Sequence, residues 1–400
     1  MCTINKSDLN NMIAKMSVLA SEEVKATFTM FAKKVEDKYL NQVRLTGKSE
    51  QVEVNFYVAA DGDDKKATKF SVESKRFCEV ASSLLTFDKD VDIAASDGVV
   101  SLSIENTTLT IPTTTSIDPI SFNKEGAVAV TMEGKAFNTV LRKGGFAVDK
   151  NSSKPQCKAA TLEVALDESK TITVSSSDAN IIAQATGTAQ AVKVADGVES
   201  LKAAIPAEAL EAVLKLTQGA SVVNFMATQT QFAVAAGGTM FVCTLATQSM
   251  DVSKFLQMWN ALKLEEGVTV DADSILNAVK VLNVADPDNK GFFLKLDGEE
   301  RFDIVTASGK QNVALFPIES LENFAETDTG ISKLYLEKIV KNLNKGNVTI
   351  RTNNSGQMPY VITNGTCKEP DTKAVAYVMK MKMTVAKKVE ETEEAAESAE

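Results

Sequence analysis

Three segments of the chain share one spacing of apolar residues, which predicts three amphipathic helices. In residues 77–84, 210–217 and 336–343, apolar side chains stand at offsets zero, three, four and seven, with Thr217 the one polar exception. This spacing puts them on one stripe of an α-helix. An apolar, β-prone stretch follows each segment, at residues 91–93, 222–225 and 348–350. The chain therefore repeats a helix-then-strand unit three times.

A second family of predicted helices precedes the first. Its apolar anchors are Leu9, Phe137 and Ile275, each with apolar residues three and four positions later. Equivalent anchors lie 128 and 138 residues apart in this family, and 133 and 126 in the other. Both spacings are near one third of the 400-residue chain. They predict three consecutive domains of like architecture, each with two helices and about eight strands.

Strand signals fill the rest of each repeat. Residues 99–105 and 107–114 alternate between apolar and polar side chains, and the turn Ser96-Asp97-Gly98 precedes them. The pair Gly237-Gly238 interrupts another β-prone run and predicts a hairpin, because glycine accepts a positive φ. The expected fold class is α+β, with antiparallel sheets and both helices of each domain on one sheet face.

Composition indicates a globular chain in a reducing compartment. Hydrophobic residues make up 44% and charged residues 24% of the chain, and no apolar run approaches the roughly 20 residues that span a bilayer. The first residues are polar where a signal peptide needs an apolar stretch. Five cysteines, scattered and odd in number, do not form a disulfide framework. We expect a cytoplasmic protein that does not bind membranes.

The sequence argues against an enzyme. It contains no histidine, which removes the usual general base of Ser-His and Cys-His sites and the commonest zinc ligand. It has no CxxC pair, no GxxxxGK[ST] phosphate loop and no GxGxxG motif. We therefore predict no catalytic residues, no cofactor and no metal.

Charge is unevenly distributed along the chain. The formal net charge is −10, and residues 387–400 hold six glutamates against two lysines, which predicts a solvated, disordered acidic tail. Cations nevertheless recur on the predicted helices. Arg142 and Lys280 stand five residues after the first anchor, and Lys15 and Lys143 stand six after it.

The other helix family carries cations in the same way. Lys215 and Lys341 stand five residues after its anchor with Lys338 nearby, while Lys75 and Arg76 stand at the start of the first domain's helix. Offsets of five and six lie off the apolar stripe, so these side chains are expected to face solvent. Together they predict a basic surface for sequence-independent contact with DNA phosphates. The alternative is that each is an ordinary solvated lysine.

Four segments, in this order along the chain, resemble the bacterial DNA polymerase III beta subunit, the sliding clamp. They are FAVDKNSSKPQCKAATLE (146–163), SSSDANIIA (175–183), AIPAEALEAVLKL (204–216) and YVMKMKM (377–383). The resemblance covers residues 1–383. Ala179, Asn180 and Ile181 replace the family's glycine, histidine and arginine, and Lys380 replaces its proline. The chain is thus similar to a divergent clamp, encoded either by a bacterium or by a phage.

The resemblance implies a fold and a function. The fold is three consecutive sliding-clamp domains, at residues 1–124, 125–252 and 253–386, with the acidic tail at 387–400. Two chains would form a ring-shaped, head-to-tail homodimer around double-stranded DNA. A clamp loader would open this ring, and the ring would tether the replicative DNA polymerase, in a bacterial cell or a phage-infected host. The rival hypothesis is a non-replicative, β-rich repeat protein with an interaction or virion structural role.

The resemblance also implies site residues. A loop with Lys150, Asn151 and Lys154 matches the family position that contacts DNA near the pore rim. Together with the helix cations, the predicted DNA-binding residues are Lys15, Lys75, Arg76, Arg142, Lys143, Lys150, Asn151, Lys154, Lys215, Lys280, Lys338 and Lys341. A groove for partner peptides would comprise Cys157, Ser177, Ala179, Asn180, Ile181, Ile182, Lys254, Phe255, Val378, Met379, Lys380, Met381 and Lys382. The dimer interface would pair Leu109 and Ile111 with Leu282 and Val284. The alternatives are a plain surface loop for the rim residues, and ordinary core packing for the methionines and interface residues.

Overall fold

The structure is a computed structural model. It describes residues 2–19, 24–35, 38–48, 52–59, 68–115, 120–260, 267–297, 301–320, 329–343, 346–352, 359–364 and 373–382. The chain divides into two compact units, residues 1–178 with 184–250, and residues 179–183 with 251–400. The predicted acidic tail, residues 387–400, lies outside the described residues, as does Met383.

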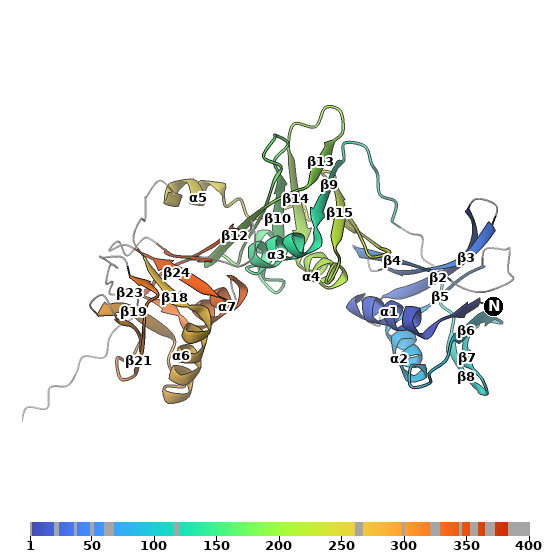
Figure 1. The fold of residues 1–400 in the computed structure, drawn as a ribbon, viewed down its shortest axis with the longest axis horizontal. Helices are drawn as coiled ribbons and strands as arrows, with labels where there is room; N and C mark the ends of the chain where they lie inside the picture. Colours follow the sequence, from blue (N-terminus) through green and yellow to red (C-terminus); the bar gives the residue numbers. More distant parts are fainter. Residues whose placement is uncertain are drawn as a thin grey trace, which may run out of the picture. The chain divides into compact units, whose positions relative to one another are not determined.

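The first unit contains four α-helices and two short 3-10 helices among its described residues. They are α1 (Lys6–Met16), η1 (Ser17–Leu19), α2 (Ser74–Leu84), α3 (Gly134–Gly145), η2 (Pro155–Lys158) and α4 (Ala207–Leu216). The helices of each predicted repeat pack in pairs, α1 with α2 and α3 with α4 (Figure 1). The pairing buries the apolar stripes that the sequence predicts, including Phe77, Phe137 and Leu210.

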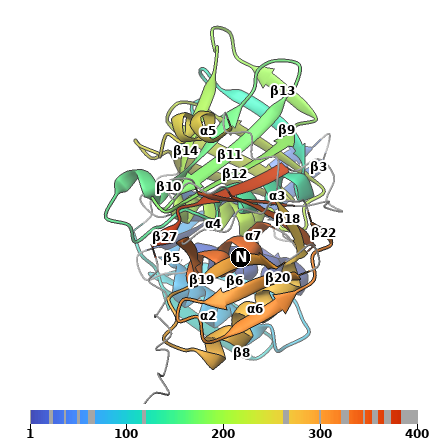
Figure 2. The ribbon, with the colours of Figure 1, turned by 90° about the vertical axis from the view of Figure 1, so that its left-hand side faces the viewer.

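The strands of the first unit are antiparallel. They are β1 (Cys2–Ile4), β2 (Lys25–Val35), β3 (Lys38–Lys48), β4 (Val52–Ala59), β5 (Thr68–Glu73), β6 (Val91–Ser96), β7 (Val99–Ile104), β8 (Thr107–Pro112), β9 (Val128–Glu133), β10 (Ala159–Val164), β11 (Thr171–Ser177), β12 (Ile181–Thr188), β13 (Ala191–Val194), β14 (Leu201–Pro206), β15 (Val222–Ala227), β16 (Gln231–Ala236) and β17 (Thr239–Thr244). Three series of neighbours follow: β1-β6-β7-β8, β14-β10-β11-β12 and β13-β9-β15-β16-β17-β4-β3-β2-β5. Figure 2 shows β10 and β11 side by side.

The second unit contains three helices and ten strands among its described residues. The helices are α5 (Ser253–Asn260), α6 (Ala272–Ala285) and α7 (Lys333–Leu343). The strands are β18 (Val268–Asp271), β19 (Gly291–Asp297), β20 (Arg301–Thr306), β21 (Asn312–Leu315), β22 (Glu319–Ser320), β23 (Thr329–Ser332), β24 (Asn347–Arg351), β25 (Tyr360–Asn364), β26 (Lys373–Val378) and β27 (Met381–Lys382). They follow the orders β26-β25-β24-β18-β22 and β21-β20-β19-β23-β27, and α6 packs on α7.

Local signals explain where these elements begin and turn. The side chains of Asn5 and Asp271 cap α1 and α6 by accepting from the backbone N–H groups of Asp8 and Ser274. The β16–β17 hairpin turns at Gly237 and Gly238, whose φ angles are 52° and 73°. Two consecutive positive φ values match a type I′ turn. The predicted hairpin is therefore confirmed.

The polar residue in the second helical stripe has a structural reason. Thr217 is 1% exposed, and its hydroxyl donates to the carbonyl of Val213 at 2.7 Å. The same hydroxyl accepts from Asn138 Nδ2, on α3, at 2.8 Å. A buried hydroxyl costs little when it is hydrogen-bonded in this way. Thr217 therefore links α4 to α3 while filling an apolar position.

The first two predicted domains share a sheet. Strand β4 pairs with β17 from Val52 to Phe56, which joins the first repeat to the second. Glu53, in the middle of this seam, is 1% exposed. Its carboxylate accepts from Asn55 Nδ2 at 2.6 Å and from the backbone N–H of Ile120. These bonds satisfy a buried charge and tie the connection between the repeats to the seam.

The predicted repeats are confirmed in their elements, and one α-helix was not predicted. Helices and strands occur at the expected positions in all three repeats, but α5 is an additional helix at the start of the third. The boundaries at residues 124 and 252 stay predictions. Within the described residues, no helix combines the length and the apolar character needed to cross a membrane.

Candidate DNA-binding and partner-binding surfaces

The cations at offset five of the helices are exposed. Arg142 on α3 and Lys280 on α6 face solvent, as do Lys215 on α4 and Lys341 on α7. An offset of five lies about 150° from the centre of the apolar stripe, so the backbone itself directs these side chains outward. Lys341 Nζ lies 2.5 Å from a carboxylate oxygen of Glu337, one turn earlier. The exposure predicted for these four cations is confirmed.

The cations at offset six are not solvated as predicted. Lys143 is 0% exposed, so the expectation that it faces solvent is wrong. Lys15 is half-buried, and its ammonium donates to the carbonyl of Gly237 at 3.2 Å and to Thr239 Oγ1 at 2.7 Å. Burial lowers the pKa of Lys15. Offset six lies only about 110° from the centre of the stripe, where a neighbouring element can cover it.

The remaining predicted DNA contacts lie at the start of α2, in one loop and in the middle of α7. Lys75 and Arg76 are exposed at the start of α2, and Arg76 pairs with Glu79 at 3.4 Å. Lys150, Asn151 and Lys154 are exposed in the loop after α3, with Lys150 Nζ 3.8 Å from Glu211. Lys338 on α7 is half-buried. Exposed ion pairs of this kind are weak and yield readily to phosphate.

Several predicted groove residues are buried. Cys157 and Ser177 are 0% and 1% exposed in the first unit, and Ile181, Ile182 and Val378 are buried in the second. Their assignment to the partner-peptide groove stays a prediction. Ala179, Asn180, Lys254, Phe255 and Met379 are exposed, and Lys380 and Met381 are half-buried. The side chain of Lys382 lies outside the described residues.

Part of the predicted groove is a connected cluster within the second unit. The N–H of Met379 donates to the carbonyl of Asn180 at 3.0 Å, and Asn180 Nδ2 donates to the hydroxyl of Tyr335 at 2.9 Å. Lys380 Nζ lies 5.4 Å from the ring centre of Tyr360. Burial lowers the pKa of Lys380 to about 8. The structure thus brings together Asn180, Met379 and Lys380, and it adds two tyrosines that the sequence analysis missed.

The backbone is strained at Ala179, the residue that precedes Asn180 of this cluster. Its φ is 78°, in the left-handed region that favours glycine. The resemblance places a glycine at this position in the clamp family, whereas this chain carries a Cβ there. A non-glycine residue in this region costs on the order of 1 kcal/mol.

The predicted interface residues divide between core and surface. Leu109 and Ile111 lie on β8, the edge strand of its four-stranded sheet as described, and Ile111 is buried. On α6, Leu282 is 1% exposed and belongs to the core, whereas Val284 is 77% exposed. Val281 and Phe316, 57% and 80% exposed, were not predicted. For Val281 the signal was available, because it stands at offset six of an otherwise regular amphipathic helix.

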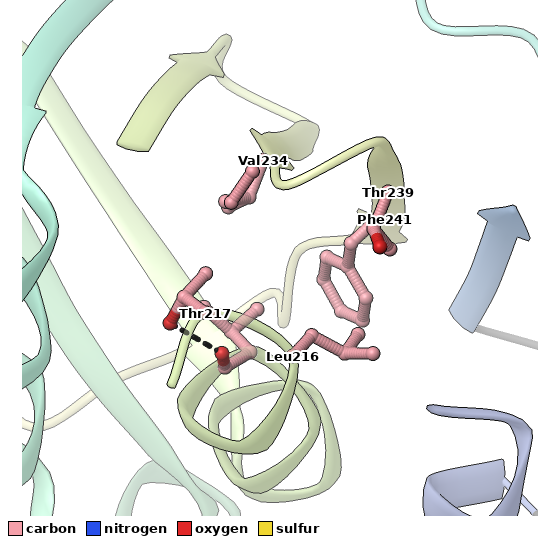
Figure 3. A pocket seen from close by; sticks show the side chains of 7 residues that line it. Leu216, Thr217, Val234, Thr239 and Phe241 are labelled. Atoms are coloured by element: carbon pink, nitrogen blue, oxygen red, sulfur yellow. Dashed lines mark hydrogen bonds between the residues drawn. The ribbon is translucent and has the colours of Figure 1, made fainter. Parts of the chain in front are cut away.

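One pocket among the described residues is small and mostly apolar. A pocket between α4 and the β16–β17 hairpin encloses about 10 Å³, roughly the space of one water (Figure 3). Leu216, Val234 and Phe241 line it, and the hydroxyl of Thr217 is bonded within its own helix. The described residues contain no group of three or more acidic or cysteine side chains placed to hold a metal. Burial raises the pKa of the Cys78 thiol to about 11 and that of Cys243 to about 12, so both thiols are protonated at neutral pH.

Solved structures of bacterial beta clamps match nearly the whole chain. The beta clamp of Helicobacter pylori in complex with diflunisal aligns with a TM-score of 0.76 at 12% identity, covering 95% of this chain and 100% of that one. The DNA polymerase III subunit beta of Pseudomonas aeruginosa aligns with a TM-score of 0.75 at 14% identity, covering 96% and 100%. The Helicobacter pylori beta clamp bound to a DNA ligase peptide gives 0.73 at 13%, covering 95% and 99%.

These similarities define the fold. The chain has the fold of the bacterial sliding clamps over at least 95% of its length, which confirms the predicted fold class of three clamp-like repeats. No family model matches the sequence, and no curated protein matches it significantly. At 12–14% identity the chain shares the backbone fold of these clamps, and most of its side chains differ from theirs.

Proposed function

We propose that this protein is a DNA sliding clamp that works by encircling duplex DNA, without chemistry of its own. The observation that carries the proposal is the clamp fold, which covers 95% of this chain and all of a beta clamp chain. The exposed cations of α3, α4, α6 and α7 support it. The non-replicative repeat protein predicts neither a closed ring nor a dependence on duplex DNA.

The exposed cations suit a ring that slides. Lysine carries a point charge on a flexible stem, so it attracts phosphates without fixing a register. Arg142, Lys215 and Lys280 are exposed on α3, α4 and α6. Phosphate contacts hold a protein on duplex DNA and carry no sequence information. Two lysines do not belong to this surface. Lys143 is buried, and the ammonium of Lys15 is hydrogen-bonded to Thr239.

A head-to-tail dimer would close the ring. Strand β8 offers an edge in one chain, and α6 offers the exposed Val281 and Val284. Contacts between different surfaces of identical chains close into a ring when the rotation between them allows it. Because an exposed strand edge and exposed valines invite association, we place the interface there.

Partners would reach the ring through short peptides. A Helicobacter pylori clamp structure contains a DNA ligase peptide. By analogy, we propose that a replicative DNA polymerase and a clamp loader carry peptides that bind near Met379 and Asn180. The tethered polymerase would then meet the primer end at a high effective concentration. The cytoplasm of a bacterial or phage-infected cell fits this role.

Retention on circular DNA tests the proposal. The chain is loaded on nicked circular duplex by a bacterial clamp loader and separated by gel filtration, before and after linearisation of the circle. We expect a particle of twice the 42.9 kDa chain mass in solution, retention on the circle, and release from the linear form. Reversing Arg142, Lys215, Lys280 and Lys341 to glutamate should reduce retention at least tenfold and leave the dimer intact.

A matched variant separates a local charge effect from a global one. Lys124, Lys193, Lys290 and Lys310 are exposed and lie outside the helices, and reversing them makes the same change in net charge. This variant should keep most of the retention. A monomer that binds circular and linear duplex alike would refute the clamp proposal, and equal losses in both variants would refute the choice of residues.

A further inference from the structure

Contacts with neighbouring residues fix the position of Lys380 within the second unit. It lies between β26 and β27, half-buried, with its ammonium 5.4 Å from the ring centre of Tyr360. Tyr360 is 1% exposed, and its hydroxyl donates to the carbonyl of Thr329 at 2.9 Å. The ring is therefore a fixed platform, and its face attracts the cation. A lysine held in this way loses less freedom on binding an anion than a fully solvated one.

Apolar and amide groups border this cation. Met379, the preceding residue, exposes 43% of its surface. The segment is anchored because the Met379 N–H donates to Asn180, whose side chain donates in turn to Tyr335. An adaptable thioether beside a cation and an amide matches a ligand that combines an apolar side chain with a negative charge.

This cation departs from the family pattern that the chain resembles. The sequence resemblance places a proline at the position of Lys380, and a proline offers neither charge nor donor. Carboxylate binding would offset the desolvation that lowers the pKa of Lys380, because an opposite charge favours the ammonium form. The surface is thus complementary to an acidic ligand at a point where the family pattern is neutral.

We propose that Lys380 makes this surface selective for acidic partner peptides, with an apolar side chain packed on Met379 and a neighbouring carboxylate paired with Lys380. The inference deepens the proposed function and rests on it. The chain's own residues 387–400 are acidic too, but Val389 is their only large apolar residue. They match the charge of the surface and not its apolar part, so an external peptide is the occupant that fits both.

A parallel peptide selection tests the inference. Random displayed heptapeptides are selected on the intact dimer and on its Lys380→Gln variant, and the strongest binder is synthesised with a twin in which Asp or Glu becomes Asn or Gln. We expect enrichment of an acidic residue next to an apolar one on the natural dimer alone. The acidic peptide should bind about tenfold more tightly than its twin, as measured by fluorescence anisotropy, and Lys380→Gln should remove that difference.

Control variants separate the charge of Lys380 from general effects. Lys380→Arg should keep the preference, and Lys380→Glu should reverse it in favour of a twin that carries lysine. Lys373→Gln removes another exposed lysine, at the start of β26, and should change the preference less than twofold. The variants must retain the dimer mass, so that a failure to fold is recognised.

The outcomes that overturn the inference are distinct from those that overturn the clamp proposal. Peptides that bind the natural dimer and Lys380→Gln with the same acid preference refute the role of Lys380 and leave the clamp intact. Failure to enrich any peptide refutes this binding surface, while retention on circular DNA still decides the clamp proposal. If peptides bind only after residues 387–400 are removed, the chain's own glutamates occupy the surface and an external partner is excluded.

Discussion

The same position of two equivalent helices has opposite surroundings in α3 and α6. Six residues after the first apolar anchor, α3 carries Lys143, which is 0% exposed, and α6 carries Val281, which is 57% exposed. The charged side chain is buried and the apolar one is in solvent. Hydropathy alone predicts the reverse at both places. Burial at this position is therefore set by the elements that cover the flank of each helix.

The packing of α3 explains the difference. This helix ends at Gly144 and Gly145, and a Cβ on Gly144 would lie within 2.3 Å of the carbonyl oxygen of Val174 on β11. A Cβ on Gly145 would lie 2.6 Å from Leu210 of α4. The two glycines let β11 and α4 approach closely and cover the end of the helix. In α6 the equivalent end continues to Ala285 with Val281 and Val284 exposed.

Reversing the buried charge should have the largest effect. Lys143→Glu places a carboxylate in a fully buried site, and we expect it to lower the free energy of unfolding by at least about 3 kcal/mol. Lys280→Glu, at the exposed offset five of α6, should change it by less than about 0.5 kcal/mol. Urea unfolding followed by circular dichroism measures both. If the two variants lowered the free energy of unfolding equally, the burial of Lys143 would not explain the effect of its substitution.

Removing the ammonium of Lys15 should have an intermediate effect. Lys15→Met keeps most of the side-chain volume but loses the bonds to Gly237 and Thr239, which cross from the first repeat to the second. We expect a loss of about 1 to 2 kcal/mol in the same urea assay. Lys215→Met, on the exposed face of α4, is the matched control and should stay within about 0.5 kcal/mol. A neutral Lys15→Met would show that the contact adds nothing to stability.

Giving α6 the residue that α3 carries should have the smallest effect. Val281→Lys exchanges an exposed valine for a lysine whose stem and charge can both reach solvent. The free energy of unfolding should change by less than about 0.5 kcal/mol. A loss above about 2 kcal/mol would place Val281 in a covered site and would remove the contrast between the two helices.

Much of the fold follows from local patterns in the sequence. The stripes at residues 77–84, 210–217 and 336–343 became α2, α4 and α7, and the Gly237-Gly238 turn became the β16–β17 hairpin. These elements can be predicted because the period of an amphipathic helix and the positive φ of a tight turn depend only on residues that are close in sequence. The helix α5 was missed, since its eight residues provide only two turns of periodicity.

The candidate surfaces were less predictable. The offset-five cations were placed correctly because they point directly away from the core. Among the predicted groove residues, Ile181, Ile182 and Val378 are buried. Tyr335 and Tyr360, which the sequence analysis missed, come to Asn180 and Lys380 from other segments. A resemblance aligns positions along the chain, and it does not show which side of a strand each side chain takes in a divergent sequence.

By itself, the sequence determined the three repeats, the positions of the paired helices and the outward direction of Arg142, Lys215, Lys280 and Lys341. Only the tertiary structure decided that Lys143 is enclosed, that Lys15 and Glu53 join the first two repeats, and that Lys380 rests on Tyr360. The physical reason is the range of the interactions. Periodicity and turn preference act over a few residues, whereas burial and the partner of a charge depend on segments that meet only when the chain has folded.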